Sequence, residues 1–185
     1  MSLLSDINTV KCLLDEEELL LQLAEEATEL TDAVIEYVQS MGTMAVLMDD
    51  DTYPKKVLEE IADVQLVVAV LLTPDEIEDV RNEVKKSWSP VKPIIRQLFV
   101  TKLCRMCLKM SKQSMKLRRA KTGKNPTPIP ADKARADLLE TIKTVLILCE
   151  RMIEHLEGHQ TVVEVSNYKA DRWVDRLING IKNGK

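Results

Sequence analysis

Proline and glycine stand only at the borders of segments in which apolar residues recur every three to four positions. The clearest such segment follows Asp15 and ends at Gly42, with an apolar stripe formed by Leu20, Leu23, Ala27, Leu30, Val34, Tyr37 and Met41. A stripe of this period is one face of an amphipathic helix. The 185 residues include only six aromatics and five glycines, too few for the strands and turns of a sandwich or barrel. The sequence therefore predicts an all-α protein.

The same reasoning predicts seven helices. Asp15 with Glu18 and Thr73 with Glu76 have the spacing of reciprocal N-terminal caps, and Asp132 is expected to cap a later helix. The expected helices cover about 2–14, 15–41, 52–72, 74–88, 94–120, 132–157 and 162–179.

No apolar run is long enough to cross a bilayer, and the N-terminus lacks the pattern of a secretory signal. The four cysteines show no disulfide framework, and Cys12 and Cys149 are expected to be buried thiols. We therefore expect a cytoplasmic protein that does not contact membranes.

The helix order (long helix, loop, helix, shorter helix) occurs twice, which suggests an internal duplication. At a constant offset, three residues of the first half match three of the second: Val80, Asn82 and Trp88 match Val165, Asn167 and Trp173. The predicted repeats are 1–88 and 94–185, joined by a proline-rich linker at 89–93.

The two halves differ in charge. Residues 1–88 carry 21 acidic and 6 basic side chains, whereas residues 89–185 carry 9 and 20. Net charges of −15 and +11 predict halves that attract each other, the first suited to cations and the second to anions such as phosphates.

Four carboxylates occur in two pairs, each one helical turn apart. Glu26 and Glu29 border the apolar stripe of one helix, and Glu60 and Asp63 open the apolar segment 64–72 of the next. Desolvating like charges costs several kcal/mol per group unless a cation compensates. The pattern favours a divalent metal site, and an acidic face paired with the basic half is the alternative.

These motifs, Glu25-Glu26-Ala27-Thr28-Glu29 and Leu58-Glu59-Glu60-Ile61-Ala62-Asp63-Val64, resemble the signature of the MazG-like all-α nucleoside triphosphate pyrophosphohydrolases. That superfamily is related to dimeric dUTPases and phosphoribosyl-ATP pyrophosphohydrolase. Parts of the second half, including Lys116–Ala120 and the loop 123–128, are similar to small phage and bacterial relatives.

The resemblance implies a helical bundle of two fused MazG-like repeats, a pseudo-dimer. It makes Glu26, Glu29, Glu60 and Asp63 the ligands of Mg²⁺, for which Mn²⁺ is a substitute. Glu25 becomes an outer-shell carboxylate or a base acting through water. Three basic residues of the last helix are then expected near the polyphosphate: Lys169, Arg172 and Arg176.

The second repeat departs from the family pattern. Its positions equivalent to the metal ligands and Glu25 are Arg105, Met106, Lys109, Thr141 and Thr144, which cannot bind a metal. Conversely, the first repeat has Val84 and Ser87 where the second has Lys169 and Arg172. We therefore expect one composite site, with carboxylates from the first half and cations from the second. Since family members are homodimers or tetramers, a homodimer of two such chains is also compatible with the resemblance.

The implied reaction is hydrolysis of a (deoxy)nucleoside triphosphate to the monophosphate and pyrophosphate, a house-cleaning of the nucleotide pool. The alternative is a catalytically inactive helical relative that binds nucleotides or a protein partner. Candidates for stacking on the base are Tyr37, Tyr53, Trp88 and Trp173.

Other chemistries have weaker support. The basic run 109–124 lacks aromatics for stacking, so we expect no nucleic-acid binding. Neither histidine has a glutamate three residues before it, which argues against a di-iron bundle. A zinc site remains a weak alternative, built from Cys104, Cys107, His155 and His159.

Overall fold

The computed structural model describes residues 2–42, 52–87, 96–123 and 129–182. These ranges contain helices and no strand, so the all-α prediction is confirmed. The helices are α1 (Leu3–Leu13), α2 (Glu16–Gly42), α3 (Thr52–Leu71), α4 (Pro74–Lys86), α5 (Arg96–Thr122), α6 (Ala131–His155) and α7 (His159–Lys182).

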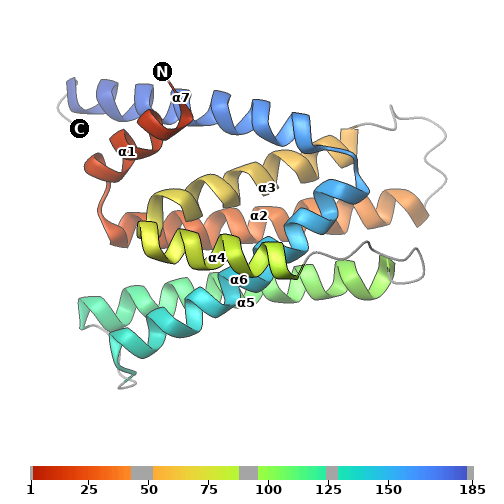
Figure 1. Cartoon of the computed structure of the whole chain (residues 1–185), viewed down its shortest axis with the longest axis horizontal. Coiled ribbons are helices and arrows are strands. Elements are labelled where there is room, and N and C mark those ends of the chain that lie inside the picture. Colours follow the sequence, from red (N-terminus) through yellow and green to blue (C-terminus); the bar gives the residue numbers. More distant parts are fainter. Residues whose placement is uncertain (1, 43–51, 88–95, 124–128, 183–185) are drawn as a thin grey trace.

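Two helical pairs form the body of the molecule (Figure 1). Helix α2 packs against α3, α5 packs against α6, and the two pairs meet along α2 and α5. The helix that follows each pair crosses to the other one, because α4 packs against α6 and α7 packs against α3. Helix α1 lies across α7 and α3. Residues from the two ends of the sequence therefore meet beside α3.

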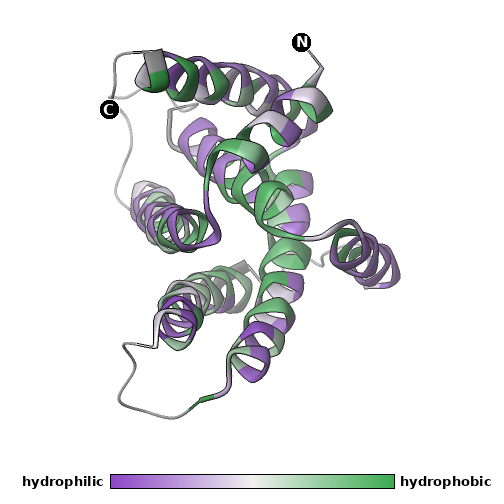
Figure 2. Cartoon of the chain, turned by 90° about the vertical axis from the view of Figure 1, so that its left-hand side faces the viewer, coloured by the Kyte–Doolittle hydropathy of each residue, from purple (hydrophilic) through white to green (hydrophobic). Residues whose placement is uncertain are grey.

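Helix α3 lies deepest in this arrangement. The prediction that its segment 64–72 is buried is confirmed, since its side chains from Val64 to Leu72 are buried except for Gln65 and Ala69, which are partly exposed. The Gln65 side chain donates a hydrogen bond to Glu150 on α6, at 3.1 Å. Most other helices have both hydrophilic and hydrophobic residues along their length (Figure 2), as amphipathic helices around a shared core require.

Two of the predicted helix starts are confirmed atom by atom. The backbone N–H of Glu18 donates to Asp15 Oδ1 at 2.8 Å, and the N–H of Asp15 donates back to Glu18 Oε2 at 3.2 Å. Thr73 and Glu76 form the same reciprocal pair at the start of α4, where Pro74 is the first helical residue. Both pairs satisfy N–H groups that a helix start leaves without a partner.

The starts of α6 and α7 differ from prediction. Helix α6 begins at Ala131 after Pro130, without a side-chain cap, and Asp132 lies within its first turn. Helix α7 begins at His159, because Glu157 with φ +52° and Gly158 turn the chain within three residues. A Cβ at position 158 would lie 2.4 Å from Leu58 Cδ1, so the close approach to α3 depends on glycine. As a result α7, at 24 residues, nearly equals α6 at 25 and is not the shorter helix expected.

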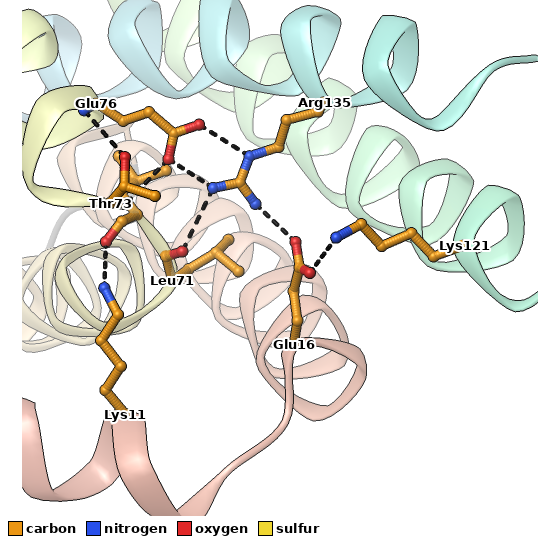
Figure 3. A network of polar contacts seen from close by, with 8 residues as sticks. Lys11, Glu16, Leu71, Thr73, Glu76, Lys121 and Arg135 are labelled. Atoms are coloured by element: carbon orange, nitrogen blue, oxygen red, sulfur yellow. Dashed lines mark hydrogen bonds and ion pairs between the residues drawn. The ribbon is translucent and has the colours of Figure 1, made fainter.

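The expected attraction between the halves appears as ion pairs. Acidic residues of the first half pair with basic residues of the second in the contacts Glu17–Arg118, Glu16–Lys121, Glu16–Arg135, Glu76–Arg135, Asp79–Lys143 and Asp63–Lys169. We call the group of Glu16, Glu76, Lys121 and Arg135 the Arg135 network (Figure 3).

Three further predictions have mixed outcomes. Cys149 is buried as expected, but Cys12 is exposed on α1, so its prediction as a core thiol is wrong. No described helix has the length and apolar content that crossing a membrane requires. The predicted linker 89–93 and Trp88 lie outside the described residues.

Candidate functional site

Three carboxylates come together where α2 and α3 pack. Glu26 lies on the inner face of α2, and Glu60 and Asp63 lie one turn apart on α3. One oxygen of each lies within 4.8 Å of one oxygen of the other two. We call Glu26, Glu60 and Asp63 the three-carboxylate cluster. Only 8% of the Glu26 surface is exposed, and Glu60 and Asp63 are partly buried.

Burial opposes ionisation in this cluster. Desolvation raises the pKa of Glu26 to about 7, and repulsion from Asp63, Glu29 and Glu60 adds to the rise. Desolvation and repulsion from Asp63 likewise raise the pKa of Glu60 to about 7. The pKa of Asp63 is also raised by desolvation, although its hydrogen bond with Lys169 works in the opposite direction. The cluster therefore holds more negative charge than its surroundings compensate.

The cluster has few partners of its own. Gln22, one turn before Glu26, donates a hydrogen bond to Glu26 Oε1, and Lys169 forms an ion pair with Asp63 Oδ2. Glu60 Oε2 is buried and has no hydrogen-bond partner among the described residues. A buried carboxylate oxygen without a partner is costly, so it is a natural position for a cation ligand.

A cavity of about 380 Å³ opens beside the cluster, a size within the range of small-molecule sites. We call it the composite cavity, because α2, α3 and α7 all contribute to its wall. It is lined by Gln22, Glu26, Glu29, Asp63, Leu66, Val67, Lys169, Arg172, Trp173 and Arg176.

The α7 side of the composite cavity is cationic. Lys169, Arg172 and Arg176 follow each other at spacings of three and four residues, so they share one face of the helix. The Arg172 guanidinium lies 5.3 Å from the centre of the Tyr168 ring and donates a hydrogen bond to the Tyr168 hydroxyl at 3.3 Å. A row of cations of this kind suits an extended anion such as a polyphosphate.

The structure brings together most of the residues predicted for the site. Glu26, Glu29, Asp63 and the three α7 cations all line the composite cavity. Glu60 belongs to the three-carboxylate cluster but does not line the cavity, and Glu29 lines the cavity but does not belong to the cluster. Glu25 is exposed and belongs to neither.

The four candidates for base stacking are separated. Trp173 lines the composite cavity beside Leu66 and Val67, which gives the cavity an apolar wall. Tyr37 instead lies near His155, with 3.4 Å between Oη and Nε2, and Tyr53 lines a different cavity. Trp88 lies outside the described residues.

The second half has no corresponding acidic group within the described ranges. Arg105 and Lys109 are exposed, while Thr141 and Thr144 donate hydrogen bonds to carbonyls of their own helix at 3.1 Å. Throughout the described residues, the three-carboxylate cluster is the one group of potential metal ligands close enough to share an ion, so the zinc alternative gains no support.

Three residues that line the composite cavity were not predicted as site residues: Gln22, Leu66 and Val67. Gln22 could have been found from its position four residues before Glu26, which places both on one helix face. Leu66 and Val67 belong to the apolar segment 64–72, whose pattern predicts burial but does not indicate that they line a cavity. Tyr168 contacts Arg172 without lining the cavity, and its spacing of four residues from Arg172 is too common on helices to single it out.

The donor set of the cluster fits a hard divalent cation. Its ligand atoms are carboxylate oxygens, which Mg²⁺ and Mn²⁺ prefer, and the partnerless Glu60 oxygen gives the group an unsatisfied acceptor. Comparisons with models of protein families, with curated proteins and with solved structures find no match for this chain.

Proposed function

We propose that the protein is a Mg²⁺-dependent nucleoside triphosphate pyrophosphohydrolase that acts in the composite cavity. The observation that carries the proposal is that one cavity joins carboxylates of the first half to cations of the last helix. The reaction class follows the resemblance of the two acidic motifs to MazG-like enzymes. In this reaction, water cleaves the bond between the α- and β-phosphates and releases a nucleoside monophosphate and pyrophosphate.

In this proposal the residues divide the work by charge. Glu26, Glu60 and Asp63 hold Mg²⁺, with Glu29, which lines the cavity, as a further ligand. When bound, the ion supplies Lewis-acid activation and offsets the negative charge of the triphosphate. Arg172 and Arg176 bind phosphate oxygens, and the indole of Trp173 with Leu66 and Val67 offers the base an apolar surface.

We further propose that the chain is a fused pseudo-dimer. The packing supports this idea. If α2 is exchanged for α5, α3 for α6 and α4 for α7, the α3–α7 contact becomes the α6–α4 contact. The exchange also leaves the α2–α5 contact in place. Of the two sites that this exchange relates, only one has carboxylates at the positions of the metal ligands, which is consistent with a single composite site.

The test is a substrate panel. The purified protein is incubated with Mg²⁺ and each ribo- and deoxyribonucleoside triphosphate, and the monophosphate and pyrophosphate are measured together. We expect equimolar products for at least one substrate and loss of activity by at least 100-fold in Glu60→Gln. The matched control is Glu78→Gln, the same change on the exposed surface of α4, which should keep the wild-type rate.

The outcomes separate the proposed enzyme from its rival. Release of inorganic phosphate without pyrophosphate would contradict the reaction class. Binding of Mg²⁺ and nucleotide without turnover would identify an inactive binding protein on the same scaffold. Equal activity in Glu60→Gln and Glu78→Gln would remove the three-carboxylate cluster from the mechanism.

A further inference from the structure

Lys169 occupies an unusual place between the two charged walls of the composite cavity. It belongs to the cationic face of α7, yet its ammonium group is ion-paired with Asp63, a member of the three-carboxylate cluster. The Lys169 and Asp63 side chains are 31% and 16% exposed, so this pair is partly shielded from water. Within the described structure, it is the one ion pair that involves a carboxylate of the cluster.

The other cationic side chains near the cluster interact with other residues or lie further along α7. Lys56 forms an ion pair with Glu36 at 2.7 Å, and Arg172 contacts Tyr168. Lys169 is therefore the cation in direct contact with the cluster, whereas Lys56 attracts Glu60 without forming an ion pair with it. A divalent cation that binds Glu26, Glu60 and Asp63 would bring two positive charges to the position now served by one ammonium.

Resting on the proposed function of this site, we infer that Lys169 is an internal counter-ion that a divalent metal displaces. In the metal-free protein its ammonium holds Asp63. When the metal binds, repulsion drives the ammonium away from Asp63, and the flexible four-carbon stem lets it move within the composite cavity. Lys169 then becomes available to a phosphate group.

This exchange has a consequence for the order of binding. A metal ion arriving alone must break the Lys169–Asp63 pair without a new partner for the ammonium. A metal ion arriving with a polyphosphate provides that partner, so the two ligands assist each other. Lys169 thus weakens the affinity for free metal and favours the metal–polyphosphate complex.

The first test is a titration of the full-length protein with Mn²⁺ alone, followed by the electron paramagnetic resonance signal of the unbound ion. We expect Lys169→Met to bind Mn²⁺ at least fivefold more tightly than wild type. The matched control is Arg172→Met, which removes one positive charge from the same cavity without breaking a contact to Asp63. It should change the Mn²⁺ affinity less than twofold.

A double-mutant comparison isolates the pair. In an Asp63→Asn background, Lys169→Met should no longer tighten Mn²⁺ binding, because no ion pair is left to break. Equal tightening by Lys169→Met and Arg172→Met would assign the effect to overall charge and overturn the inference. Weaker Mn²⁺ binding by Lys169→Met would also overturn it.

A second readout follows the lysine itself. We expect acetic anhydride to modify Lys169 at least threefold faster when Mg²⁺ is saturating, because the freed amine lies near a divalent cation and is no longer held by Asp63. Lys143, paired with Asp79 and Glu140, is the internal control and should keep its rate. An unchanged rate at Lys169 despite Mg²⁺ binding would refute displacement while leaving the metal site intact. Failure of wild type and both variants to bind Mn²⁺ would instead refute the proposed metal site itself.

Discussion

Two charged regions join the halves of this protein, and they shift the pKa values of their carboxyl groups in opposite directions. In the Arg135 network, Arg135 donates to Glu76 at 2.6 and 3.0 Å and to Glu16 at 2.8 Å, while Lys121 also pairs with Glu16 (Figure 3). The hydrogen bonds from Arg135, together with the one from the backbone N–H of Thr73, lower the pKa of Glu76 to about 2. In the three-carboxylate cluster, three acids share one lysine, and the pKa values of Glu26 and Glu60 rise to about 7.

The difference lies in the balance of charge rather than in the presence of a cavity. A cavity of about 430 Å³ adjoins the Arg135 network, slightly larger than the composite cavity of about 380 Å³. The acids of that network already have cationic partners, so it can stabilise the fold without a ligand. In the three-carboxylate cluster Lys169 is the one ion-pair partner among the described residues, so the cluster could accept a further cation, which is why the proposed function is placed there.

The largest expected contrast is in metal affinity. Asp63→Asn should weaken Mn²⁺ binding at least 50-fold, because it removes one of three ligands in the cluster. Glu16→Gln in the Arg135 network should change the affinity less than twofold. Both affinities are measured by titration at a temperature where each variant is folded. Similar losses of Mn²⁺ affinity in Asp63→Asn and Glu16→Gln would show that the two regions do not differ in metal binding.

The next contrast is in stability. Arg135→Met leaves Glu16 and Glu76 without their shared partner, and the Arg135 side chain is only 22% exposed. We expect the free energy of unfolding to fall by about 3 kcal/mol, at the lower end for breaking a shielded ion pair. Lys143→Met also removes a cation from α6, but its partners Asp79 and Glu140 are 60% and 72% exposed, so it should cost only about 0.5 kcal/mol. Urea unfolding at pH 7 measures both, and equal losses would contradict the special role of Arg135.

Acid should weaken the Arg135 network in a defined window. Since folding lowers the pKa of Glu76 from 4.5 to about 2, its contribution is complete above pH 4.5 and is lost as the pH falls from 4.5 to 2. The full shift corresponds to about 3 kcal/mol, and the 20% exposure of this side chain reduces the contribution to about 2 kcal/mol. The difference in unfolding free energy between wild type and Glu76→Gln should therefore shrink across this window. A constant difference would show that Glu76 acts through packing instead.

The smallest contrast concerns a gain in stability. In the metal-free protein at pH 8, Glu60→Gln should raise the free energy of unfolding by about 1 kcal/mol, because it removes a buried charge whose Oε2 has no partner. Excess Mg²⁺ should stabilise wild type alone, so that wild type becomes more stable than Glu60→Gln. Thermal unfolding with and without Mg²⁺ measures both effects. A loss of stability in the metal-free variant would show that Glu60 already has adequate partners.

Local sequence rules predict much of the fold. The caps at Asp15 and Thr73 depend on residues three positions apart, so they can be identified without tertiary information. The start of α7 cannot, because it depends on Gly158 approaching Leu58, which is 100 positions away in the sequence. The exposure of Cys12 is likewise not predictable from local pattern, because it depends on how α1 lies across α7 and α3.

The candidate site can be predicted in its parts more readily than in its assembly. The spacing of Glu26, Glu60 and Asp63 beside apolar stripes is enough to single them out as candidate metal ligands. That Asp63 meets Lys169, rather than another cation of the basic half, depends on the packing of α7 against α3. The exposure of Glu25 is not evident from the motif, since this residue is adjacent to Glu26 but faces away from the core.

The most direct test of the composite site is a crystal structure of the protein with Mn²⁺ and tripolyphosphate, using the anomalous signal of manganese. We predict a manganese peak among Glu26, Glu60 and Asp63, with the tripolyphosphate extending from it toward Arg172 and Arg176. A manganese peak away from the three-carboxylate cluster, or a tripolyphosphate bound without contact to α7, would contradict the composite site.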